Sequence, residues 1–284
     1  MSIVVGAIVT VAVVAVAVAT MLLVRRRAPA GSRFSDGDRA SGVFGVVATG
    51  FSVLLGFIVF LAFESYDEAR SGAESEARIV VQQLETAQFL APDDAARLSG
   101  ELVCYARYVV SEEWEQMADG ELGEAVNPWG VALYRTIRDV VPASDTQQSA
   151  YDRWMDQTAA REDARQSRVH GAEGLIPVPL WLVLFVVSGT VFVFLLFFAD
   201  SAERAATQGL LMGSVALVVT LLLCLLAFFD HPHGHQVGKL RPTAMERSLV
   251  LLVGEARAAG VEIDPPCDDS GTAPSPVGLP APAS

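Results

Sequence analysis

Four long stretches without a charged residue constrain the fold of this chain more than any other feature. They cover residues 2–24, 42–63, 174–199 and 205–229, and each holds at least 22 residues. A helix rises about 1.5 Å per residue, so about 20 apolar residues cross the hydrocarbon core of a bilayer. Buried helices of globular proteins are usually shorter and amphipathic. We therefore predict an all-α membrane protein with four transmembrane helices, arranged as two hairpins around an intervening helical soluble domain.

The first stretch lacks the charge order of a cleaved signal peptide. Signal peptides carry basic residues before the apolar stretch, whereas here Arg25, Arg26 and Arg27 follow it. We therefore expect a retained transmembrane helix.

The polar segments divide the chain into five expected parts. These are a first transmembrane hairpin over 1–63, an acidic helical domain over 64–173, a second transmembrane hairpin over 174–229, an amphipathic helical tail over 230–264 and a disordered, proline-rich C-terminus over 265–284. The second span meets no helix breaker before Pro92, so we expect its helix to continue out of the membrane. The three cysteines, Cys104, Cys224 and Cys267, have no metal-type spacing and indicate no disulfide scaffold.

The central domain is strongly acidic. Residues 64–173 contain 22 acidic and 10 basic side chains, which accounts for most of the net charge of −13. This sign of charge argues against a nucleic-acid partner. The chain has no P-loop, dinucleotide-binding glycine pattern or nucleophile elbow, so we expect neither an enzyme nor a cofactor. The run Glu112, Glu113 and Glu115 is interpreted as a solvated helix face.

The second span carries a candidate pore stripe. Thr49, Val53, Phe57 and Leu61 recur every four residues on one helix face. Spacing alone favours an ordinary helix–helix interface. No span contains a charged residue, which disfavours a proton pump or a charge-coupled transporter. A pore closed by an apolar constriction needs no such charge.

Three alternate histidines, His231, His233 and His235, form a weak candidate metal site. Their two-residue spacing also includes Pro232 and Gly234, and no cysteine lies nearby. A turn at the membrane interface explains this pattern better, so no metal is predicted.

Several motifs together resemble one family. The segment LLGFIVFLAFESYD (54–67) resembles the second membrane helix of bestrophins, and DHPHG (230–234) followed by LRP (240–242) resembles the turn after their last span. A closer match is to a bacterial bestrophin-like membrane family of unknown function. The segments ESYDEAR (64–70), NPWG (127–130) and HGAEG (170–174) carry this match, which covers about residues 42–253.

The resemblance implies a homo-oligomeric, pentameric ion channel of the bacterial plasma membrane, with the lipid bilayer and inorganic ions as its partners. The second span would line the pore, with apolar rings at Val53 and Phe57 and with Thr49 where a third apolar residue is expected. The acidic domain at one mouth would favour cations. The alternative is a non-conducting scaffold or sensor whose acidic domain binds a partner.

Two arguments about orientation conflict. Five arginines between the first two spans indicate that this link is cytoplasmic, which would place the acidic domain outside. The bestrophin layout implies a cytoplasmic domain, and Lys239, Arg241 and Arg247 in the tail agree with it. We favour the bestrophin orientation because it rests on the whole layout.

Overall fold

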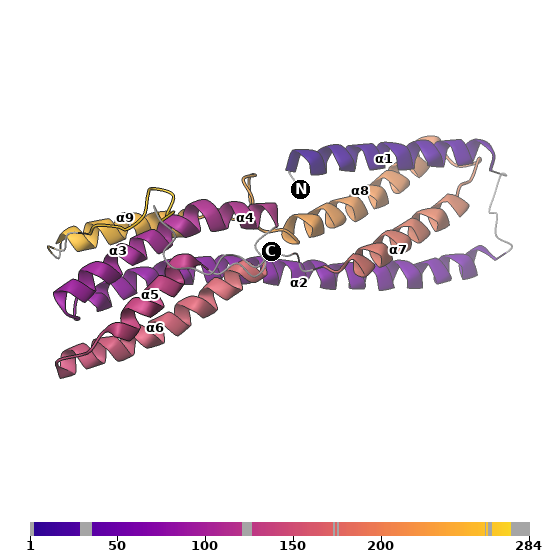
Figure 1. Cartoon of the computed structure of the whole chain (residues 1–284). Coiled ribbons are helices and arrows are strands. Elements are labelled where there is room, and N and C mark those ends of the chain that lie inside the picture. The colour runs from indigo at the N-terminus through magenta and orange to yellow at the C-terminus, as the bar shows by residue number, and fades with distance from the viewer. Residues whose placement is uncertain are drawn as a thin grey trace, which may run out of the picture. The chain divides into compact units, whose positions relative to one another are not determined.

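The computed structural model describes residues 3–28, 36–120, 127–172, 174, 176–258, 260 and 263–273 (Figure 1). These residues are almost entirely helical, with one isolated bridge between His233 and Leu240. The helices are α1 (Ile3–Arg26), α2 (Gly37–Ala87), α3 (Pro92–Tyr108), the π-helix η1 (Val109–Glu113), α4 (Trp114–Asp119), α5 (Pro128–Asp139), α6 (Asp145–His170), α7 (Val178–Phe197), α8 (Ala205–Phe229) and α9 (Thr243–Ala258). The predicted all-α class is confirmed.

Four of these helices, α1, α2, α7 and α8, are long and apolar enough to cross a membrane. The chain divides into two compact units. The membrane unit comprises residues 1–66 and 174–231, and the acidic unit comprises residues 67–173 and 232–284. The third span begins later than expected, at Val178, because Gly174 has a positive φ of 78° and Pro177 is the extended residue that precedes the helix.

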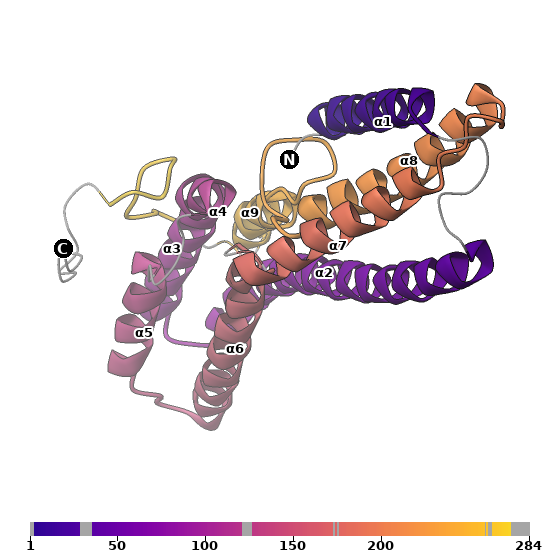
Figure 2. The ribbon, with the colours of Figure 1, turned by 90° about the vertical axis from the view of Figure 1, so that its right-hand side faces the viewer.

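The core of the membrane unit joins α2 to the last two spans. Its buried residues are Phe51, Leu55, Ile58 and Ala62 of α2, Leu184 and Val191 of α7, and Val219 and Leu226 of α8. Helix α1 packs along α8, and Met21 of α1 contacts Met212 of α8 (Figure 2). The α7–α8 pair therefore lies between α1 and α2, so the expected first hairpin is not a packed pair (Figure 1). Helix α1 packs its apolar side chains against α8 and not against α2.

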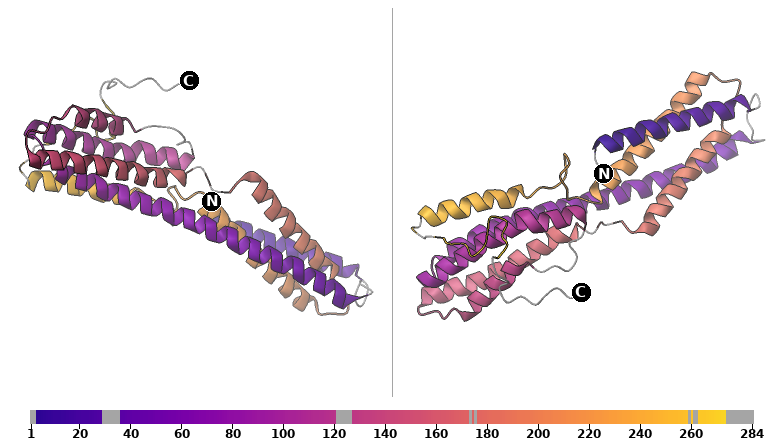
Figure 3. Two further views of the ribbon diagram at one scale, coloured as in Figure 1. Left: turned by 90° about the horizontal axis from the view of Figure 1, so that it is seen from below. Right: turned by 45° about the horizontal axis from the view of Figure 1, so that its top comes forward.

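The acidic unit is a helical bundle built on the C-terminal part of α2. Helices α3, α6 and α9 lie along this part of α2, and α5 packs against α3 (Figure 3). Local signals start the helices: Pro92 lies in the first turn of α3, Asn127 caps α5 and Ser144 caps α6. Three tryptophans of this unit, Trp114, Trp129 and Trp154, are all buried.

The segment 263–273 lies against α3 and α5. Cys267 forms a disulfide with Cys104 of α3, and the Trp129 indole donates a hydrogen bond to the Gly271 carbonyl at 2.6 Å. A Cβ at Gly271 would collide with the backbone nitrogen of Tyr108, and the φ of Gly271 is 79°. The expectation of disorder from residue 265 onward is therefore corrected for residues 265–273. It rested on composition alone, which does not reveal these contacts. Residues 274–284 lie outside the described residues.

Candidate functional site

The predicted pore stripe lies on the exposed side of α2. Val53 is 69% exposed and Phe57 is 60% exposed, and Thr49 and Leu61 are exposed as well. At 100° per residue, Thr49, Val53 and Phe57 lie opposite the buried residues Phe51, Leu55, Ile58 and Ala62. The stripe therefore takes no part in the packing of the membrane unit. It is not a helix–helix interface within a single chain.

Glycines widen the space on this side of α2. A Cβ placed at Gly42, Gly45, Gly50 or Gly56 would meet nothing within 4 Å. Small residues allow helices in a membrane to approach closely. This side of α2 can therefore pack against another protein surface or line an axis between copies of the chain.

The three histidines have different surroundings. The Nδ1 atom of His231 lies 3.5 Å from the carboxylate of Asp230, and the Nε2 atom of His235 lies 3.3 Å from Glu115. His233 is buried against Trp114, with ring centroids 5.4 Å apart. Within the described residues, no group of three or more metal-binding side chains forms.

The burial of His233 changes its protonation. Neither ring nitrogen has a hydrogen-bond partner among the described residues. Burial, together with the nearby charges of Arg168 and Lys239, lowers the pKa of His233 to about 3. The ring is therefore neutral at physiological pH.

The segments HGAEG (170–174) and DHPHG (230–234) contact each other. In the acidic unit, a Cβ at Gly171 would lie 2.9 Å from Ala69 and 3.2 Å from Pro232. In the membrane unit, the Asp230 carboxylate accepts a hydrogen bond from the Ile176 amide at 2.8 Å. The close packing around Gly171 explains why this position has no side chain.

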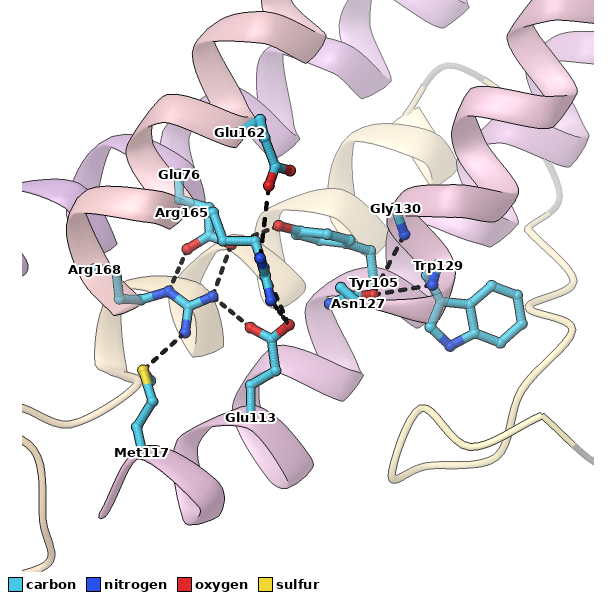
Figure 4. Close-up of polar contacts among 10 residues, drawn as sticks. All are labelled: Glu76, Tyr105, Glu113, Met117, Asn127, Trp129, Gly130, Glu162, Arg165 and Arg168. Atoms are coloured by element: carbon cyan, nitrogen blue, oxygen red, sulfur yellow. Dashed lines mark hydrogen bonds and ion pairs between the residues drawn. The ribbon is translucent and has the colours of Figure 1, made fainter. Parts of the chain in front are cut away.

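A buried ionic cluster joins the helices α2, α3, η1 and α6 of the acidic unit (Figure 4). The Arg168 guanidinium of α6 donates to Glu76 of α2 at 2.5 and 3.1 Å and to Glu113 of η1 at 2.5 Å. Arg165 donates to the other oxygen of Glu113 at 3.1 and 3.2 Å, and the Tyr105 hydroxyl donates to Glu76 at 2.6 Å. We name these five residues the arginine–glutamate cluster.

Sequence reasoning missed this cluster. Glu113, interpreted as part of a solvated face, is only 1% exposed. Burial raises the pKa of its carboxyl, but the charges of Arg168 and Arg165 outweigh this effect and hold the pKa below the usual value. Burial lowers the pKa of the Arg168 guanidinium, but the negative charges of Glu76 and Glu113 outweigh this effect and raise the pKa above its usual value. Glu113, Arg165 and Arg168 are therefore charged and paired, whereas burial and the charge of Glu76 raise the pKa of the Tyr105 hydroxyl, which stays neutral. This arrangement suits a structural role.

The fold defines a class: a helical membrane protein with four candidate spans. Its second span is uncharged, and one side of that span makes no packing contact within the membrane unit. A sequence profile of the bestrophin-like domain matches residues 11–237, and the chain belongs to this family. This confirms the family resemblance. The comparison with curated proteins finds no match.

Solved structures share this fold. A point variant of a bacterial bestrophin homologue from Klebsiella pneumoniae aligns with a TM-score of 0.63 and 15% identity, covering 89% of this chain and 99% of that chain. A structure of a bacterial bestrophin homologue from Klebsiella pneumoniae, phased with zinc, aligns with a TM-score of 0.63 and 15% identity, covering 89% of this chain and 98% of that chain. A further crystal structure, described as that of a membrane protein, aligns with a TM-score of 0.65 and 14% identity, covering 89% of this chain and 98% of that chain.

Proposed function

We propose that this protein is an oligomeric ion channel of the plasma membrane, with α2 lining the pore. The observation that carries this proposal is the exposure of Thr49, Val53 and Phe57 on the side of α2 that the membrane unit leaves unused. In a family of bestrophin-like proteins, this side would face the axis of a ring of chains. The resemblance to bestrophins implies a pentamer.

The apolar side chains on this stripe would form the narrowest part of the pore. Rings of Val53 and Phe57 would exclude water when the pore is closed, because an apolar constriction gates by dewetting. The hydroxyl of Thr49 would leave the adjoining ring more polar. Membership of the family supports a function in transport and no enzymatic activity.

Ion flux into liposomes tests the neck. Val53→Ala plus Phe57→Ala shortens both apolar rings, and the flux should rise above that of the wild-type protein. Phe185→Ala plus Val186→Ala is the matched control, because both side chains are 59% exposed on α7. The control should leave the flux unchanged. Absence of flux from every inserted protein would favour the scaffold or sensor alternative.

We further propose a preference for cations. The helix of the second span continues beyond Phe63, and its next carboxylates, Glu64 and Asp67, are exposed. Rings of these acids around an axis would concentrate cations at that end of the pore. Glu64→Gln plus Asp67→Asn should lower the ratio of cation to chloride permeability, measured from reversal potentials in a salt gradient. An unchanged ratio would contradict this assignment.

A further inference from the structure

We propose that this chain is inserted with its acidic unit outside the cytoplasm, opposite to the bestrophin orientation, and that an oxidising compartment closes the Cys104–Cys267 disulfide there. Two independent observations support this orientation. One is the pairing of the two cysteines, and the other is the distribution of arginines over the short links between spans. The inference does not depend on ion conduction.

The disulfide belongs wholly to the acidic unit. Cys104 is fully buried in α3, and Cys267 belongs to the segment 263–273. The Cα atoms are 5.8 Å apart, which is ordinary for a disulfide. Disulfides of this structural kind persist in extracytoplasmic compartments and are rare in the cytosol, where thiol reductants keep cysteines reduced.

The contacts around Cys267 show a site shaped for the closed pair. The Arg107 guanidinium donates to the Asp268 carbonyl at 3.1 Å and pairs with Asp269 at 3.3 Å. Gly100 leaves room for the chain before Cys267, because a Cβ there would meet the Asp264 carbonyl at 3.0 Å. These contacts hold the segment that carries Cys267 against α3, where Cys104 lies.

Closing the bond is a two-electron oxidation. The two thiols lose two protons and two electrons as the sulfur–sulfur bond forms. A protein disulfide of an extracytoplasmic thiol oxidase would accept both electrons and become a dithiol. The same exchange has no suitable oxidant in a reducing cytosol.

The arginines point to the same orientation. Five arginines lie between residues 25 and 39, in the link between α1 and α2 or in the adjoining helix ends, and Arg204 lies in the link between α7 and α8. The Arg25 guanidinium donates to the carbonyls of Ser201 and Glu203, so both links lie at one end of the membrane unit. Figure 1 shows the C-terminal end of α1 beside the start of α8. Six arginines in or directly beside two short links mark this end as cytoplasmic.

The basic residues outside these links carry less weight. They belong to the acidic unit, and long domains cross a membrane largely regardless of their charge. The tail directly after the last span contributes three, Lys239, Arg241 and Arg247, against the six in or beside the links. Several are also neutralised or buried, since Arg165 and Arg168 pair with carboxylates and Lys239 is 8% exposed. Along the chain, one span separates the first link from residues 67–173, so an orientation with cytoplasmic links puts these residues outside the cytoplasm.

Cysteine labelling in intact cells tests the orientation. In the Cys224→Ser chain, which keeps the disulfide pair, a single cysteine is added as Arg153→Cys in the acidic unit or as Ser41→Cys at the start of α2; both positions are exposed. A membrane-impermeant maleimide should label Arg153→Cys in intact cells and Ser41→Cys only after permeabilisation. The reverse pattern, or labelling of both in intact cells, would overturn the proposal. The Cys224→Ser chain without an added cysteine is the control.

Acid trapping of the wild-type chain tests the bond without any substitution. A large maleimide should shift the mobility by one thiol, that of Cys224, before reduction, and by three thiols after reduction. Three modified thiols before reduction would overturn the disulfide and with it the oxidising compartment.

Discussion

At the scale of single residues, buried charged side chains determine much of the stability of the acidic unit. The arginine–glutamate cluster places Arg168 in a site with no exposed surface, between Glu76 and Glu113. Removing one partner of such a cluster leaves a buried charge without compensation. That is far more costly than the loss of a surface ion pair.

Arg168→Met should lower the free energy of unfolding of the acidic unit by about 3–5 kcal/mol. The substitution keeps the length of the side chain and leaves both carboxylates unpaired at that position. The control is Arg153→Met, an exposed position on the same helix, which should change the free energy by less than about 0.5 kcal/mol. Thermal unfolding followed by circular dichroism in detergent measures both. Equal melting temperatures would show that the cluster is dispensable.

His233 should make the stability depend on pH. Its pKa is about 3 in the folded protein and about 6.5 when unfolded, so only the unfolded chain takes up a proton between these values. The free energy of unfolding should fall as the pH drops below about 6.5, by at most about 1.4 kcal/mol per pH unit. His233→Gln should flatten the slope of melting temperature between pH 5 and 6.5. The exposed His235→Gln should keep that slope, and a common slope for both variants would refute the assignment.

At the scale of elements, α2 and α6 cross without space for a side chain. A Cβ at Gly72 would lie 2.7 Å from both the Ala164 carbonyl and the Arg168 amide. These are backbone atoms of a helix and cannot move aside singly. The close crossing also brings α6 near enough for Arg168 to reach Glu76 of α2.

Gly72→Ala should therefore lower the free energy of unfolding by about 1–3 kcal/mol. Gly254→Ala in α9 is the matched substitution, because a Cβ there meets nothing within 4 Å. It should be neutral or stabilising by up to about 1 kcal/mol, since alanine favours helices. Denaturant unfolding of both variants measures the difference. A loss of the same size in Gly254→Ala would show that the crossing is not the cause.

The C-terminal segment is a second element whose stability can be measured. Its disulfide closes a sequence separation of 163 residues, which restricts the unfolded chain strongly. Cys104→Ser plus Cys267→Ser should lower the free energy of unfolding by about 2–5 kcal/mol. Cys224→Ser, which leaves the disulfide intact, should cost less than about 1 kcal/mol. Equal stability of the two variants under oxidising conditions would contradict the bond.

At the scale of the whole molecule, the membrane unit leaves one side of α2 unused. Its other side packs with α7 and α8, so the unit has a core without this surface. Exposed Phe57 and neighbouring glycines suit contact with lipid, with a second copy or with a pore axis. A ring of copies is the arrangement in which this surface carries ions, and the flux and permeability measurements above decide whether it does.

Much of the architecture could be predicted from the sequence, because it depends on local and additive properties. Four uncharged stretches predict four apolar helices, since backbone amides in a bilayer must bond within their own helix. The run without a breaker to Pro92 predicts the long α2, and the amphipathic tail expected over residues 230–264 contains α9. The stripe of Thr49, Val53 and Phe57 follows from the helical period alone, and so does its separation from Phe51 and Leu55.

Only the tertiary structure decided which surfaces meet. The sequence cannot show that α1 packs on α8, because all four spans are equally apolar and offer no selective signal. Nor can it show that Glu113 is buried while its neighbour Glu115 is exposed, because burial there depends on Arg165 and Arg168, more than 50 residues away. The pairing of Cys104 with Cys267 has the same origin: contacts between distant segments bring the two sulfurs together, and local composition carries no record of them.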